Sequence, residues 1–183
     1  MDERQQILVA YESRHGATRE IAERVVESLR AYGEWKVALR IAERVSDLSP
    51  YRAVILGSPV YDGRWLPEAE TFVRAHEREL ARLPLWLFSV ATFGDTQRHL
   101  GELVKREPHG IERLQAVLHP RSYRVFAGVI DAALWPWYGR LFLRVLGGQT
   151  GDNRDWLEID RWIEQIVAAL RAQRTLEPVA SRL

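Results

Sequence analysis

The sequence predicts an α/β protein with a doubly wound parallel sheet of five strands between two layers of helices. Short apolar runs alternate with longer amphipathic runs, which is typical of strands joined by helical crossovers. One strand pattern is amphipathic and the others are almost wholly apolar, which predicts one exposed edge and a buried centre. These features favour the strand order 2-1-3-4-5 in three layers.

The opening of the chain predicts a buried strand and then an amphipathic helix. Residues 7–11 (ILVAY) form an apolar run after a polar start. Residues 18–32 follow with apolar side chains at helical spacing. These side chains are Ile21, Val25, Leu29 and Tyr32. We expect the helix to end at Gly33.

Four further strands follow from their apolar patterns. Residues 36–41 alternate apolar and polar side chains, as a half-exposed edge strand does. Residues 53–56 and 85–90 are nearly unbroken apolar runs, which indicates strands covered on both faces. Residues 123–130 supply the fifth strand. Ligands of such sheets bind beyond the carboxyl ends of the strands, so the loops after residues 11, 56, 90 and 130 form the predicted site.

Helical patterns also occupy the three remaining amphipathic stretches. Residues 67–80 begin with proline, which suits a first helical turn, and turn Phe72, Val73 and Leu80 inward. Residues 92–119 also have a largely helical pattern. Residues 156–171 form the last helix. Its apolar stripe consists of Ile159, Ile163, Ile166, Val167 and Leu170.

Length and composition indicate a single globular domain. The chain has 183 residues, and a domain of this size buries about 70% of its unfolded surface. We expect residues 1–173 to form the domain and residues 174–183 a loose tail. The sequence has no cysteine, which excludes disulfides and thiolate sites and is typical of a cytoplasmic protein. A net charge of +1 argues against a nucleic-acid partner.

The loop after the first strand has the composition of an anion-binding site. It reads Ser13-Arg14-His15-Gly16-Ala17-Thr18. Ser13 and Thr18 supply hydroxyl groups, and Gly16 lets the backbone approach a ligand closely. The helix that follows begins with free N–H groups and a partial positive charge, so a phosphate is the favoured ligand. The loop has neither the lysine of a Walker loop nor G-x-G-x-x-G spacing. A turn that merely caps the helix is the alternative.

Three loops, in the same order along the chain, resemble those of the flavodoxin-like FMN-binding domain family. Residues 7–22 resemble its strand, phosphate loop and helix start. Residues 57–63 (GSPVYDG) and 91–95 (ATFGD) occupy the places of its two flavin-contacting loops. The likeness extends over residues 7–170 and implies a flavodoxin-like fold.

The resemblance also implies a noncovalently bound FMN. Its phosphate would bind the hydroxyls of Ser13 and Thr18 and the backbone N–H groups between them, with the ring between the other two loops. The implied FMN-binding residues are Ser13, Arg14, His15, Gly16, Ala17, Thr18, Pro59, Val60, Tyr61, Asp62, Gly63, Ala91, Thr92, Phe93, Gly94 and Asp95. The ring is planar and apolar on its faces, so Tyr61, Trp65 or Phe93 suits stacking on it. Plain packing in the core is the alternative for each aromatic residue.

Two later segments most resemble the subgroup that includes menaquinone-dependent protoporphyrinogen oxidase. They are residues 125–128 (VFAG) and 151–156 (GDNRDW). The subgroup implies dehydrogenation of protoporphyrinogen IX, with electrons passing from flavin to a quinone. We expect no catalytic side chain, because the cofactor carries such chemistry. The five histidines lack metal-ligand spacing, so we expect no metal and place all except His15 on the surface.

Two other functions stay open from the sequence. One is a non-enzymatic, flavodoxin-type electron-transfer protein, although the small net charge offers little steering toward a protein partner. The other is a domain that keeps the fold without a flavin, although Ser13, Gly16 and Thr18 argue against it. The oxidase itself has a long, basic and extended loop, and residues 92–119 of this sequence differ from that loop in both respects.

An aromatic segment between Leu134 and Leu146 (LWPWYGRLFLRVL) is the second unusual feature. It is too short to span a bilayer. Its helical stripe predicts that it covers the outer face of the fifth strand. The alternative is a docking helix for a partner or a membrane surface, because aromatic residues and arginines suit that boundary. A quinone-coupled enzyme at the inner membrane face would use such a contact.

Overall fold

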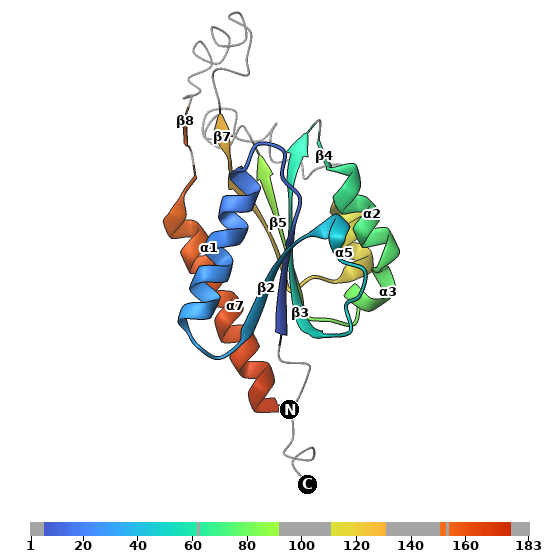
Figure 1. Cartoon of the computed structure of the whole chain (residues 1–183), viewed down its shortest axis with the longest axis vertical. Helices are drawn as coiled ribbons and strands as arrows, with labels where there is room; N and C mark the ends of the chain where they lie inside the picture. The colour runs from blue at the N-terminus through green and yellow to red at the C-terminus, as the bar shows by residue number, and fades with distance from the viewer. Residues whose placement is uncertain (1–5, 62, 92–110, 131–150, 153, 177–183) are drawn as a thin grey trace, which may run out of the picture.

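A parallel sheet forms the middle layer of the molecule, with helices on both of its faces (Figure 1). The computed structural model describes residues 6–61, 63–91, 111–130, 151–152 and 154–176. Its strands are β1 (Gln6–Tyr11), β2 (Lys36–Ile41), β3 (Tyr51–Tyr61), β4 (Arg64–Trp65), β5 (Leu85–Ala91), β6 (Ser122–Ala127), β7 (Val129–Ile130) and β8 (Gly151–Asp152). Its helices are α1 (Ala17–Ala31), the short 3-10 helix η1 (Ala42–Arg44), α2 (Pro67–Ala75), α3 (Glu77–Leu80), α5 (Ile111–Leu118) and α7 (Trp156–Leu176).

The five parallel strands lie in the order β2-β1-β3-β5-β6. Counted along the chain, these five strands have the predicted 2-1-3-4-5 order. Helices α1 and α7 cover one face, and α2, α3 and α5 cover the other (Figure 1). The predicted α/β fold of three layers is confirmed.

Each face of the sheet packs against its own hydrophobic core. On the α1 and α7 face, the rings of Phe88, Phe126 and Trp162 contact one another, with centroids 5.4 to 6.1 Å apart. The indole Nε1 of Trp162 donates to Ser122 Oγ at 2.9 Å, so this deeply buried residue keeps its hydrogen bond. The whole predicted stripe of the last helix is buried in this core.

The edge strand and the first helix agree with their sequence patterns in all but one side chain. Strand β2 pairs on one side with β1 and is partly exposed along its length. In α1, Ile21, Val25 and Leu29 are fully buried. Tyr32, expected on the same stripe, is instead 40% exposed and lies under the guanidinium of Arg171, at 5.1 Å from the ring centroid. Tyr32 is the C-cap of α1, where the helix ends.

The helix predicted over residues 67–80 is interrupted at His76. The backbone there leaves the helical region, at φ −115° and ψ 18°, and separates α2 from α3. The His76 ring lies within hydrogen-bond distance of Glu79 Oε2, at 2.7 Å, and of the Val45 carbonyl, at 3.2 Å. Its side chain is only 11% exposed, so the surface position predicted for this histidine is wrong. These contacts join α3 to the segment after η1.

The strand predicted over residues 123–130 is also two elements. Strand β6 ends at Ala127, and the N–H of Gly128 donates to the Ala91 carbonyl at 2.8 Å. Beyond this point β7 leaves the main sheet and pairs antiparallel with β8. A side chain at Gly128 would place its Cβ 3.0 Å from Val90 Cγ1, so this close crossing favours glycine.

The last helix extends to Leu176, three residues into the segment expected to be a tail. Within the described ranges, no helix has both the length and the apolar character needed to cross a membrane. The segment between Leu134 and Leu146 lies outside those ranges.

Gly57 leaves room for the Phe88 ring on the neighbouring strand and provides a test of the packing. It pairs with Phe88 across β3 and β5, and a Cβ at this position would lie 2.0 Å from Phe88 Cζ. We expect Gly57→Ala to lower the free energy of unfolding by about 1–3 kcal/mol, because overpacking forces neighbours to move. Urea titration measures this loss. The double variant Gly57→Ala with Phe88→Leu should recover part of it, and an unchanged midpoint in the single variant would contradict the packing.

Candidate functional site

The carboxyl ends of β1, β3 and β5 meet at one edge of the sheet, where the first predicted loop lies. The three strands are parallel and adjacent. The N–H of Glu12, just after β1, donates to the Gly57 carbonyl at 3.0 Å. Residues predicted separately from distant loops are therefore brought to the same edge by strand register alone.

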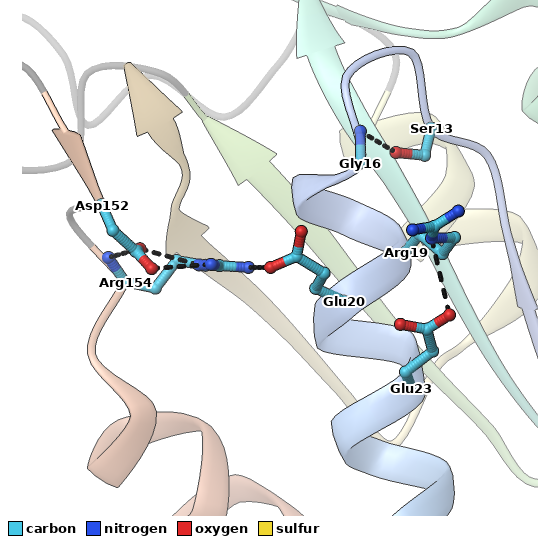
Figure 2. Close-up of polar contacts among 7 residues, drawn as sticks. All are labelled: Ser13, Gly16, Arg19, Glu20, Glu23, Asp152 and Arg154. Carbon is cyan, nitrogen blue, oxygen red and sulfur yellow. Dashed lines mark hydrogen bonds and ion pairs between the residues drawn. The ribbon is translucent and has the colours of Figure 1, made fainter. Parts of the chain in front are cut away.

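The loop from Ser13 to Thr18 closes tightly onto the start of α1. The N–H of Gly16 donates to Ser13 Oγ at 3.1 Å (Figure 2). Gly16 has a φ of 92°, in the left-handed region that glycine adopts without strain. Because Ser13 Oγ serves as an acceptor in this bond, its own O–H stays available to donate to a ligand. The buried Thr18 follows within the first helical turn.

The first N–H groups of α1 point toward this loop without backbone partners. Among the described residues, the N–H groups of Ala17, Thr18 and Arg19 have no hydrogen-bond acceptor. Unpaired N–H groups at a helix start, together with the helix dipole, favour an anion. The donor set of N–H and O–H groups fits a phosphate ester. The described residues contain no group of His, Cys, Asp or Glu able to hold a metal ion.

The same edge brings Arg14 and His15 against Tyr61 at the end of β3. The Arg14 guanidinium lies over the Tyr61 ring, at 5.3 Å from its centroid. The His15 ring meets the same ring edge-on, with centroids 6.3 Å apart. Burial raises the pKa of the Tyr61 hydroxyl, against the opposing influence of Arg14. Tyr61 is therefore an aromatic surface beside the loop.

Strand β3 is longer than predicted and takes up part of the expected second loop. Pro59 is buried and pairs in register with Val90, while Val60 pairs with Trp65 of β4. A turn through Gly63, at φ 73°, then joins β3 to β4. The apolar run over residues 53–56 did not predict that the strand continues to Tyr61. The serine and proline that follow this run are typical of loops.

Trp65 is not available to stack on a ligand. Its side chain is 4% exposed, and its Nε1 donates to Ser89 Oγ at 2.7 Å. The core-packing alternative is therefore correct for Trp65. Asp62, and Thr92, Phe93, Gly94 and Asp95, lie outside the described residues. Ala91, the first residue of that third loop, ends β5 and accepts the hydrogen bond from Gly128.

Glu12 is a buried acid at this edge that the sequence reasoning missed. Its carboxylate accepts the N–H of Glu43 at 2.9 Å, and the residue is only 8% exposed. Burial raises the pKa of Glu12, the hydrogen bond from the Glu43 N–H opposes this, and the charges of Glu43 and Glu68 raise the pKa further. The available signal was its position, directly after an unbroken apolar strand and before the anion-binding loop.

Comparison with known proteins agrees with this arrangement. A family model described as a flavodoxin domain matches residues 8–156. No functionally curated protein matches the chain. A solved rubredoxin oxygen:oxidoreductase from the anaerobe Desulfovibrio gigas superposes with a TM-score of 0.61 at 15% identity, over 92% of this chain and 36% of that one. The chain thus spans little more than a third of that oxidoreductase.

Two smaller solved proteins share the fold over most of their length. A flavodoxin from Pseudomonas aeruginosa has a TM-score of 0.57 at 14% identity, over 91% of this chain and 99% of that one. A flavodoxin from the domain Archaea has a TM-score of 0.53 at 15% identity, over 70% of this chain and 87% of that one. At these identities the likeness establishes the fold.

The raised pKa of Glu12 predicts a pH-dependent stability. Between the ordinary glutamate pKa and the raised value, the folded chain keeps a proton that the unfolded chain has lost. Stability therefore falls as the pH rises through this window. We expect Glu12→Gln, which still accepts the Glu43 N–H, to unfold at higher urea than the unmodified chain at about pH 8, and to lose that advantage at about pH 3.5.

The matched control is Glu27→Gln, which removes the same charge from an exposed position of α1. Equal behaviour of the two variants at both pH values would show that the burial of Glu12 has no effect on its titration.

Proposed function

The chain belongs to the flavodoxin domain family, whose members bind FMN in redox proteins, and we propose that it is an oxidoreductase that dehydrogenates protoporphyrinogen IX and passes the electrons to a quinone. The observation that carries the FMN site is the loop from Ser13 to Thr18, with its unpaired N–H groups at the start of α1. When bound, FMN supplies the electron-accepting chemistry. The chain supplies the binding and orientation of the cofactor.

Each part of the predicted cofactor site has a separate role in this proposal. The hydroxyls of Ser13 and Thr18 and the N–H groups from Ala17 onward hold the phosphate. Tyr61 offers an aromatic face to the flavin ring, and in this structure the Arg14 guanidinium lies over the Tyr61 ring. Asp62 and residues 91–95 complete the proposed set from the other two loops.

The overall reaction balances without any other reactant. Protoporphyrinogen IX loses six electrons and six protons to become protoporphyrin IX, while three quinones take up both and become three quinols. The likeness of residues 125–128 and 151–156 to the oxidase subgroup supports this substrate. The net charge of +1 also favours small-molecule partners, because protein carriers usually rely on a large charge for steering.

The acceptor suggests where the protein works. A quinone with a long apolar tail resides in a membrane, so we propose peripheral contact through the segment between Leu134 and Leu146. Aromatic residues and arginines at this segment suit a membrane boundary. The remainder of the chain would stay on the cytoplasmic side.

A flavodoxin-type electron-transfer protein is the second candidate. It is favoured by one observation: the chain covers 99% of a solved bacterial flavodoxin, so a comparable chain functions there as a flavodoxin. The flavin-free alternative is not retained, because the family binds FMN.

Activity separates the enzyme from the electron-transfer protein. We expect the FMN-loaded protein to convert protoporphyrinogen IX to fluorescent protoporphyrin IX under anaerobic conditions only when a menaquinone analogue is present. Protein with bound FMN but no turnover would reject the oxidase and favour the second candidate. Protein that neither carries nor takes up FMN would reject both.

Thr18 provides a direct test of the phosphate site. Thr18→Val keeps the shape of this buried side chain and removes only the hydroxyl. We expect FMN binding to weaken by about 1–3 kcal/mol, the usual cost of leaving a charged group without its partner. Titration by quenching of flavin fluorescence measures the change. Thr18→Ser is the control that keeps a hydroxyl, and equal FMN affinity in the valine variant would remove Thr18 from the site.

A further inference from the structure

An ion triad joins the segment before α7 to the first turn of α1 (Figure 2). The guanidinium of Arg154 donates to both oxygens of Asp152, at 2.7 and 2.6 Å, and from Nη1 to Glu20 Oε2 at 2.7 Å. It also lies over the Trp156 ring, at 4.5 Å from the centroid. The Arg154 side chain is only 6% exposed, which is unusual for arginine unless it is paired on several sides.

The triad is stronger than an ordinary surface ion pair. Arg154 is held by a two-point contact with one carboxylate and a third hydrogen bond to another, a geometry that fixes the guanidinium plane. The hydrogen bonds from Arg154 hold the pKa of Asp152 below its ordinary value. The Glu20 carboxylate is thereby bound to the fixed guanidinium of Arg154, which is 134 residues away in the sequence.

Glu20 also borders the anion-binding loop. Its N–H donates to the Gly16 carbonyl at 2.9 Å, and a Cβ on Gly16 would lie 3.7 Å from Glu20 Oε1. One carboxylate oxygen therefore faces the loop while the other is bound by Arg154. A phosphate at the start of α1 would meet this negative charge at short range, where repulsion between like charges is largest.

The nearby arginine of α1 does not relieve this repulsion. Arg19 pairs with Glu23, at 3.5 Å, one turn further along the helix (Figure 2). Within the described part of the chain, Arg154 is the cation that contacts Glu20.

We propose that Arg154 is a positioning residue for the phosphate of the cofactor, acting through Glu20. It neutralises the Glu20 carboxylate and holds it against Asp152, so that the carboxylate does not compete with the phosphate for the N–H groups of α1. This inference rests on the proposed FMN site. It also gives a role to Arg154 in residues 151–156, since the proposed reaction itself assigns none to this arginine.

The role predicts an effect that depends on the ligand's charge. FMN carries the phosphate, whereas riboflavin has the same ring without it. Loss of Arg154 should therefore weaken FMN and leave riboflavin unchanged. A purely structural role would change the binding of both ligands together.

The test is a set of fluorescence titrations with FMN and with riboflavin. We expect Arg154→Gln to weaken FMN about tenfold, in line with the effect of a charge at a helix terminus, with no change for riboflavin. The double variant Arg154→Gln with Glu20→Gln should regain the FMN affinity, because the unbalanced carboxylate is gone. Arg154→Lys, which keeps the positive charge, should stay close to the unmodified protein and replaces the glutamine variant if that one does not fold.

Arg24→Gln is the matched control. It removes a two-point contact between α1 and α7 that lies further along α1 from the loop, in which Arg24 donates to the two oxygens of Asp160 at 2.9 and 2.8 Å. We expect no change in FMN binding.

Equal weakening of FMN and riboflavin in Arg154→Gln, or no recovery in the double variant, would overturn the inference while leaving the FMN site intact. If riboflavin binds too weakly to titrate, the FMN affinity of the double variant Arg154→Gln with Glu20→Gln decides between the two roles of Arg154. An unmodified protein that does not bind FMN would instead reject the proposed function, and this inference with it.

Discussion

The parallel register of β1, β3 and β5 is the constraint on which the rest of the structure depends. Because these neighbouring strands run in one direction, their carboxyl ends reach one edge, and the described residues at those ends lie close together. In this register Gly57 pairs with Phe88, whose ring occupies the space that a side chain at position 57 would need. The contact of Arg14 with Tyr61 is a direct consequence, since these residues come from segments that follow different strands.

The same edge concentrates negative charge around a site suited to an anion. Glu12 lies just before the loop and Glu20 just after it, and the two carboxylates differ in burial and in their partners. Burial raises the pKa of Glu12 and disfavours its charged form, while the hydrogen bond from the Glu43 N–H acts in the opposite direction. Glu20 stays at the surface beside a buried arginine from another segment. The pairing of Glu20 with Arg154 lowers the negative charge that a phosphate in the proposed site would meet.

Elements governed by local pattern could be predicted from the sequence. The spacing of Ile21, Val25 and Leu29 is set by the helical repeat, and the alternation in residues 36–41 by the period of a strand. The loop from Ser13 to Thr18 could be predicted too, because its residue types act through their own backbone and side chains. The helix break at His76 could not be predicted in this way, and it coincides with a contact of the His76 ring to the Val45 carbonyl, which is distant in sequence.

By itself, then, the amino-acid sequence determined the α/β layers and the strand order, because these follow from hydrophobic periodicity. From local residue types it also predicted an anion-binding role for the loop from Ser13 to Thr18. Tertiary structure alone decided that Trp65 packs on Ser89, that the fifth predicted strand divides at Gly128, and that Arg154 reaches Glu20. The last pair is separated by 134 residues. No periodicity encodes such a distance, and the contact exists only once packing of α7 beside α1 has brought both segments together.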